Sequence, residues 1–196
     1  MPKCYSEEEK EEIRRRLKEE AAVCIGQFGV RRTTVDELVK RVGIPKGTFY
    51  LFYRSKEQLL FAAIAEQQAV IEGELAQKLQ AAGPSMTAGV LAEIIFGLYQ
   101  KARDLPALKG LRPSEIELLA RKLPPEVLAE HFAQDDSGFA KLFQLPPAAK
   151  LAEPQAFSAA FRALFLASTH RQEIGAEAYD EALKLLINGL TLQMIE

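Results

Sequence analysis

The side chains best suited to chemistry lie close together in one short stretch, from residue 34 to residue 56. Hydroxyl and ammonium groups of this kind donate hydrogen bonds to phosphate oxygens and to base edges, and a glycine lets another backbone approach closely. This chemistry favours contact with a nucleic acid over catalysis. The candidate residues are Thr34, Pro45, Lys46, Gly47, Thr48, Tyr50 and Lys56.

Catalytic and metal-binding arrangements are missing from the sequence. The two histidines, His131 and His170, are far apart, and neither pairs with a cysteine or another histidine at a spacing typical of zinc sites. No nucleophile elbow, phosphate-binding glycine loop or dinucleotide fingerprint occurs. Cys24 lies on an apolar helix face and Cys4 near the start of the chain, so neither predicts redox chemistry. We therefore expect no enzyme, no metal and no cofactor.

The charge of the chain is divided unevenly along its length. The net charge of −2 and the pI near 5.9 argue against a nucleic-acid partner when taken alone. Residues 1–56, however, hold 13 basic and 9 acidic side chains, whereas residues 57–196 hold 12 and 18. The balance is thus +4 in the first part and −6 in the second. This division indicates a nucleic-acid partner for the first part only, although short windows of any protein fluctuate by several charges. It divides the chain into two predicted domains, a nucleic-acid-binding one over 1–56 and a second one over 57–196.

A helix-turn-helix would place the candidate groups on one surface. Thr34 is suited to cap a short helix that ends at Gly43, because glycine readily adopts a left-handed turn. Pro45 suits the first turn of a second short helix, since its missing N–H needs no partner there. We expect the inward face of this helix to hold Phe49 and Phe52, and its outward face to hold Pro45, Lys46, Thr48 and Tyr50.

The whole chain is expected to be all-helical, because Leu and Ala are abundant and no period-2 alternation is sustained. Ser6 and Glu9 fit a capping box for a first helix whose apolar face is Ile13, Leu17, Ala21, Cys24 and Phe28, with Gly29 as its C-cap. Other helices are predicted from about 55 to 83, from 85 or 87 to 103, and over 154–170 and 175–194. Pro106 and Pro113 are expected to bracket a loop, Ser114 and Glu117 to form a capping box, and Asp136-Ser137 to open a helix. Pro146-Pro147 and Pro154 are expected to delimit a linker.

Residues 13–61 resemble the N-terminal DNA-binding domain of the TetR family of transcriptional regulators. The resemblance rests on Phe28-Gly29, Thr33-Thr34-Val35-Asp36-Glu37-Leu38, Gly43-Ile44, Lys46-Gly47-Thr48-Phe49-Tyr50 and Ser55-Lys56-Glu57-Gln58-Leu59. Val39 and Val42 stand where the family often has Ala, and Leu51 and Phe52 where Tyr and His are frequent. The resemblance implies a three-helix DNA-binding domain followed by a helical domain that dimerises and binds a small inducer.

The second part of the chain carries apolar stripes that fit this implication. One stripe, over 154–170, contains Phe157, Phe161, Leu164, Phe165 and Ser168, and the other contains Tyr179, Leu183, Leu186, Leu190 and Met194. Two such helices from each subunit suit a four-helix dimer interface, although the same stripes suit a monomer core. An aromatic-lined pocket would favour an apolar or aromatic ligand. Its candidate residues are Phe96, Tyr99, Arg103, His131 and Phe161, although these rings also suit core packing.

The leading hypothesis is a cytoplasmic, ligand-responsive repressor that binds a palindromic operator in double-stranded DNA as a homodimer. A helical enzyme or small-molecule carrier with an incidental basic head is the alternative, and a regulator that answers to a protein partner is a third. The longest apolar run, from Leu59 to Ala65, is too short to cross a membrane, and the N-terminus has no apolar segment of the secretory kind.

Overall fold

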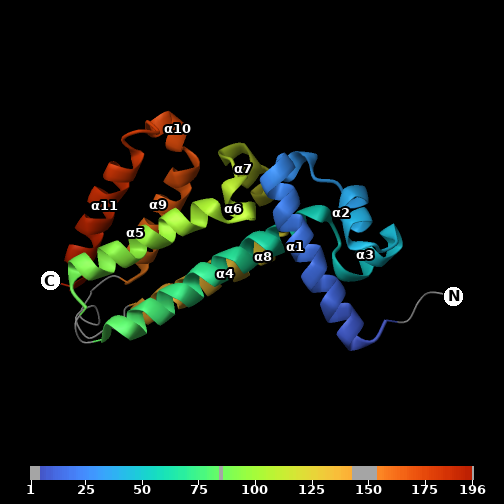
Figure 1. Ribbon diagram of the computed structural model, residues 1–196, viewed down its shortest axis with the longest axis horizontal. Helices are drawn as coiled ribbons and strands as arrows, with labels where there is room; N and C mark the ends of the chain where they lie inside the picture. The colour runs from blue at the N-terminus through green and yellow to red at the C-terminus, as the bar shows by residue number, and fades with distance from the viewer. Residues whose placement is uncertain (1–4, 84–85, 143–153, 196) are drawn as a thin grey trace. The chain divides into compact units, whose positions relative to one another are not determined.

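The computed structural model describes residues 5–83, 86–142 and 154–195, with only the backbone described at 135–142 and 154. Within these ranges the helices are joined by turns and short extended segments, as Figure 1 shows. The chain forms two compact units. Unit 1 contains residues 1–67 and 104–123, and unit 2 contains residues 68–103 and 124–196. The compact units therefore do not divide at residue 56, and a segment of the second half of the chain belongs to unit 1.

Unit 1 is built around a long first helix. Its helices are α1 (Glu7–Arg32), α2 (Val35–Val42), α3 (Lys46–Phe52), the beginning of α4 (Lys56–Ala82), α6 (Pro106–Lys109) and α7 (Pro113–Lys122). The expected capping box at the start of α1 is confirmed: the Ser6 hydroxyl accepts from the Glu9 N–H at 3.1 Å, and the Glu9 carboxylate accepts from the Ser6 N–H at 2.8 Å. Three glutamates in the first turn complement the helix dipole.

The buried face of α1 departs from the expected stripe near its end. Leu17, Ala21 and Cys24 are buried as predicted, but Phe28 is 43% exposed. Gly29 has φ of 78° and interrupts the helical conformation, so that the next buried side chain is Val30. The predicted position of Phe28 on the inward face is therefore wrong, because the break at Gly29 lets Val30 occupy the core after Ile25 in its place.

The segment after residue 105 contains short helices rather than the expected loop. α6 packs closely on α1: a Cβ atom at Gly110 would overlap the carbonyl of Ile25, and one at Gly26 would lie 2.8 Å from the Pro106 carbonyl oxygen. At the start of α7, the Glu115 carboxylate accepts from the Arg112 N–H at 3.3 Å. This contact replaces the capping box predicted for Ser114 and Glu117, which lies two residues too late in the sequence.

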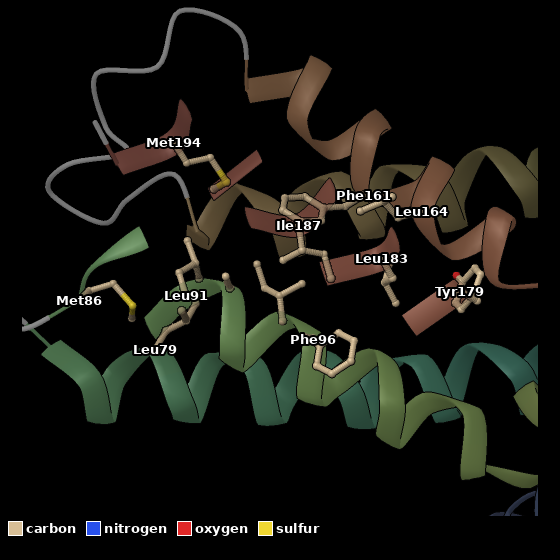
Figure 2. Packing of buried hydrophobic residues seen from close by; sticks show 12 residues of the cluster. Leu79, Met86, Leu91, Phe96, Phe161, Leu164, Tyr179, Leu183, Ile187 and Met194 are labelled. Carbon is tan, nitrogen blue, oxygen red and sulfur yellow. The ribbon is translucent and has the colours of Figure 1, made fainter. Parts of the chain in front are cut away.

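Unit 2 has its own apolar core, shown in Figure 2. Its helices are the remainder of α4, α5 (Ala88–Asp104), α8 (Pro125–Leu142), α9 (Pro154–Thr169), the short α10 (Arg171–Ile174) and α11 (Tyr179–Ile195). The core takes side chains from α4, α5, α9 and α11, among them Leu79, Leu91, Phe96, Phe161 and Ile187. α8 continues through residues 136 and 137, so the predicted helix start at Asp136-Ser137 is wrong. The predicted linker at Pro146-Pro147 lies outside the described residues, as does Cys4.

The buried face of α11 is one position away from the predicted stripe over its central turns. Tyr179, Leu183 and Met194 are buried as expected, but Ile187 occupies the core and Leu186 is exposed. The two leucines at 185 and 186 thus lie on the outward side of the helix. In the part of the chain that the structure describes, we find no helix with the length and hydropathy needed to cross a membrane.

Candidate nucleic-acid interface

The helix-turn-helix predicted from the sequence is present in unit 1. Thr34 caps α2, since its hydroxyl accepts from the Glu37 N–H at 3.2 Å. Gly43 ends α2 in the left-handed region with φ of 77°, and its N–H donates to the Val39 carbonyl. α3 begins at once after Pro45, which is the N-cap residue rather than part of the first turn. Leu38, Val39 and Val42 bury the inner side of α2.

The two sides of α3 differ sharply in exposure. Phe49 is fully buried and anchors the helix, whereas Lys46, Gly47, Tyr50 and Leu51 are exposed. Tyr50 stands edge-on to Phe49, with ring centroids 5.2 Å apart. The outward surface therefore combines an ammonium group, a glycine, a phenol and a leucine.

Thr48 does not lie on this outward surface, which corrects the sequence-based expectation. Its side chain is only 8% exposed, and its hydroxyl lies 3.4 Å from the hydroxyl of Tyr5. The helical period explains the difference: Phe49 points into the core, and the adjacent Thr48 falls on the same side, whereas residues 46, 47, 50 and 51 form the opposite side. Leu51 takes the exposed place that the sequence assigned to Thr48.

Lys46 is exposed and paired with the preceding helix. Its Nζ lies 2.9 Å from an Asp36 carboxylate oxygen, and this hydrogen bond raises the pKa of Lys46. More than half of each side chain remains accessible, so the pair contributes little stability and can open at small cost. Its ammonium group is available to a phosphate that competes with Asp36.

Lys56 serves the fold of unit 1 rather than an outward contact. Its ammonium donates to the carbonyl oxygens of Val30, Arg31 and Thr33 at 3.0, 3.2 and 2.6 Å. An ammonium has three N–H groups, so these bonds use all of them. The predicted role of Lys56 in holding the DNA backbone does not fit this geometry, because no donor remains for a phosphate.

Other basic side chains near the motif remain available. Arg41 is held by Glu37 and Glu20 and lies over the ring of Phe28. Four further cations are exposed and form no ion pair among the described residues. The positive charge balance of residues 1–56 includes these four side chains, but no DNA contact was predicted for them from the sequence. They are Arg31, Arg32, Lys40 and Arg54.

Glu115 ties α7 to the break in α1. Its carboxylate is buried and accepts from the Val30 N–H at 2.7 Å, one residue after Gly29. The N–H would otherwise lack a partner, because Gly29 interrupts the hydrogen-bond series of the helix. Together with Lys56, which binds the carbonyls of the same turn, Glu115 fixes the end of α1 that leads into the helix-turn-helix.

A family model described as bacterial regulatory proteins of the tetR family matches residues 18–63. The matched residues cover the greater part of α1, all of α2 and α3, and the start of α4. This segment belongs to the TetR family of DNA-binding domains. The N-terminal domain of the chain is the DNA-binding helix-turn-helix of a transcriptional regulator, as the sequence predicted.

Solved structures with the TetR fold resemble the chain over most of its length. SmeT, the repressor of the Stenotrophomonas maltophilia multidrug efflux pump SmeDEF, is 18% identical with a TM-score of 0.58, over 91% of this chain and 88% of that one. A TetR regulator from Marinobacter aquaeolei VT8 is 18% identical with a TM-score of 0.61, over 97% and 100%. RolR in complex with resorcinol is 17% identical with a TM-score of 0.64, over 94% and 90%. No curated protein sequence matches the chain.

Three of the five predicted ligand-binding residues meet in the core of unit 2. Phe96 and Phe161 are buried in it, and the Tyr99 hydroxyl donates to the Phe161 carbonyl at 2.7 Å. Burial raises the pKa of Tyr99 well above its usual range. His131 lies on α8, with its ring centroid 5.9 Å from that of Phe132. An open groove of about 480 Å³ between α4 and α5 is lined by other residues, including Val70, Gly73 and Lys101.

The fifth predicted residue, Arg103, belongs to a polar group at one end of this core. It pairs with Asp180 at 2.5 Å, and Arg171 lies over the ring of Tyr179, with 6.0 Å between its guanidinium carbon and the ring centroid. Tyr179 is buried, and its hydroxyl has no hydrogen-bond partner in the part of the chain that the structure describes. Burial raises the pKa of this phenol, and the charge of Arg103 opposes that shift. Figure 2 shows Tyr179 near one end of the row of core residues and Met194 near the other.

Proposed function

We propose that the chain is a ligand-responsive repressor that binds a palindromic operator as a homodimer and is released by a small apolar or aromatic inducer. It acts in the cytoplasm, on double-stranded DNA, without an enzymatic activity of its own. The observation that carries the proposal is the outward surface of α3, where exposed Lys46 and Tyr50 flank a glycine. A glycine inside a helix costs about 0.5–1 kcal/mol relative to alanine. A Cβ atom at Gly47 would meet nothing in the chain, so packing within the chain does not require a glycine there, and the backbone of α3 is open to a partner at this position.

The proposed docking follows from the positions of these groups. α3 would lie in the major groove, with Lys46 and Tyr50 on phosphates and base edges. The N-terminus of α2, capped by Thr34, would face a phosphate through its free N–H groups. Arg31, Arg32, Lys40 and Arg54 add positive charge around the motif. Two copies would read half-sites about one helical turn of DNA apart.

The homodimer is supported by the outward faces of the last two long helices. On α11, Leu185, Leu186 and Leu192 are exposed, and Gly189 lies between them with open space where a Cβ would stand. On α9, Leu166 is exposed in line with two small residues, Ala159 and Ala163. Apolar side chains and small residues on one face allow a second copy to pack closely against it.

The inducer is proposed to bind at the polar end of the unit 2 core. A buried hydroxyl without a partner is costly, and a ligand that accepts its hydrogen bond would relieve that cost. Tyr179 offers such a hydroxyl beside the rings of the core, which suits a small aromatic molecule with an oxygen atom. The complex of RolR with resorcinol is a solved example of an aromatic ligand in this fold.

The DNA-binding part is tested by selecting bound sequences from random DNA and titrating the selected operator at several salt concentrations. Lys46→Ala should weaken binding and lower the slope of log K against log salt by about 1 per protomer, because one phosphate contact is lost. Lys122→Ala, an exposed lysine at the end of α7, is the control and should leave the slope unchanged. Equal slopes for Lys46→Ala and the native chain would refute the docking.

The ligand-binding part is tested with resorcinol and phenol as probes in thermal unfolding. A probe that binds the folded protein should raise the melting temperature. Tyr179→Phe should reduce that rise, since a hydrogen bond of about 1 kcal/mol is lost, and affinity should fall about fivefold. Phe132→Leu, an exposed ring on α8, is the control. If neither probe shifts the melting temperature, a protein partner becomes the better candidate for the signal.

A further inference from the structure

The outward surface of α3 contains a residue that the docking described above does not use. Leu51 is 71% exposed, although it lies between Tyr50 and Phe52 in the middle of the DNA-binding unit. A leucine at this exposure contributes little to the packing of its own unit, because most of its apolar surface still faces water. Most of its apolar surface is therefore open to a partner outside the chain.

The neighbours of Leu51 place it in the proposed DNA contact. Gly47 lies one helical turn before it, on the same side of α3. That glycine is where the backbone can come closest to a partner, so the side chain one turn later reaches the same surface. Lys46 and Tyr50 complete this side, and both suit phosphates or base edges.

Leucine can make only apolar contacts in the major groove. It has no donor or acceptor, so phosphates, purine edges and the cytosine amino group are closed to it. The apolar group that B-DNA presents there is the C5-methyl of thymine. Thr48, whose methyl could serve the same purpose, is buried beside Tyr5.

We infer that Leu51 is a specificity-determining residue that contacts the C5-methyl group of one thymine in each operator half-site. The inference rests on the proposed function, because it needs α3 to lie in the major groove. It adds a base preference to that function: the operator carries thymine opposite Leu51, and the contact is made by apolar packing rather than by hydrogen bonds.

The test removes the C5-methyl group of thymine and the side chain of Leu51, first separately and then together. Each thymine of the selected operator is replaced in turn by deoxyuridine, which differs only in lacking the methyl. The affinity of the native chain should fall about fourfold when one particular thymine of each half-site is replaced. This is the change in affinity expected when one buried methyl-sized group is lost. Leu51→Ala should bind the unmodified operator more weakly and be indifferent to the same replacement. Leu51→Met, which keeps an apolar side chain, should retain the sensitivity.

Val70→Ala is the matched control, because it shortens an exposed apolar side chain on α4 and should keep the native response to deoxyuridine. Melting temperatures should be equal for all four proteins, since Leu51 is exposed. The inference is overturned if no thymine methyl matters to the native chain, or if Leu51→Ala keeps the same sensitivity at the same position. Failure of the proposed function gives a different result: no sequence is enriched from random DNA, and the affinity ignores sequence altogether.

Discussion

Lys46 and Lys56 carry the same charge, but their surroundings give them different roles. The ammonium of Lys56 is saturated by three carbonyl oxygens at the end of α1, whereas that of Lys46 has one exposed carboxylate partner. A phosphate can displace Asp36 from Lys46 with little loss, because surface ion pairs are weak. At the residue scale, hydrogen-bond saturation rather than charge decides which lysine is free to meet DNA.

Gly47 gives the clearest prediction at this scale. Gly47→Ala should stabilise the protein by up to about 1 kcal/mol, because alanine is the better helix former and its methyl meets nothing in the chain. The same methyl should weaken operator binding by about tenfold, or about 1.4 kcal/mol, by holding the backbone away from DNA. Chemical denaturation and operator titration measure the two effects.

Gly97→Ala is the control for this substitution. Gly97 is an exposed glycine within α5, and a Cβ atom there also meets nothing. It should give the same gain in stability without any change in DNA binding. Tight operator binding by Gly47→Ala would show that the backbone of α3 does not approach its partner closely.

At the scale of the element, the end of α1 is stabilised by residues far away in the sequence. Gly29 breaks the helix, and the Val30 N–H is satisfied by the Glu115 carboxylate on α7. The following carbonyls are satisfied by Lys56 at the start of α4. Two charged groups of opposite sign thus stabilise the end of α1, which would otherwise fray. The backbone position from which the turn into α2 begins is fixed as a result.

Glu115→Ala tests this arrangement. It removes the acceptor of two backbone N–H groups, those of Val30 and Arg112, and should lower the free energy of unfolding by about 2–3 kcal/mol. The Val30 amide should also exchange its hydrogen faster. Glu117→Ala, an exposed glutamate on the same helix, should change neither quantity by more than about 0.5 kcal/mol. Equal effects of the two variants would contradict the role of Glu115.

At the scale of the whole molecule, the outward face of α11 is the surface on which the proposed association with a second copy depends. Leu185 is 74% exposed, and Leu186 and Leu192 are exposed beside it. An operator with two half-sites is bound tightly only when two DNA-binding units are linked, because the second contact then becomes intramolecular. Dimerisation and operator affinity should therefore be lost together.

Leu185→Glu should convert the protein to a monomer in sedimentation experiments, because two buried carboxylates at the interface would have no partners. The folded monomer should keep its helical content, since residue 185 lies outside the core. Its affinity for the full operator should fall towards that for a single half-site. Val90→Glu, at an exposed valine on α5, should remain dimeric. A dimeric Leu185→Glu variant would place the interface elsewhere.

The sequence by itself determined the features that depend on near neighbours along the chain. The caps at Ser6 and Thr34, the turn at Gly43 and the buried side of α2 all arise from contacts three or four residues apart, which helical periodicity and capping preferences encode. The family resemblance, carried by the same residues, added the DNA-binding function.

Only the tertiary structure decided which of the candidate groups face outward. Lys56 bonds to carbonyls 23 to 26 residues away, Thr48 lies beside Tyr5 across 43 residues, and Glu115 reaches Val30 across 85. No local pattern records such contacts, because they depend on how helices pack after they form. The same packing exposed Leu51 and buried Ile187 in place of Leu186. The sequence predicted which surface binds DNA, and the packing of helices distant in sequence decides which side chains are exposed on it.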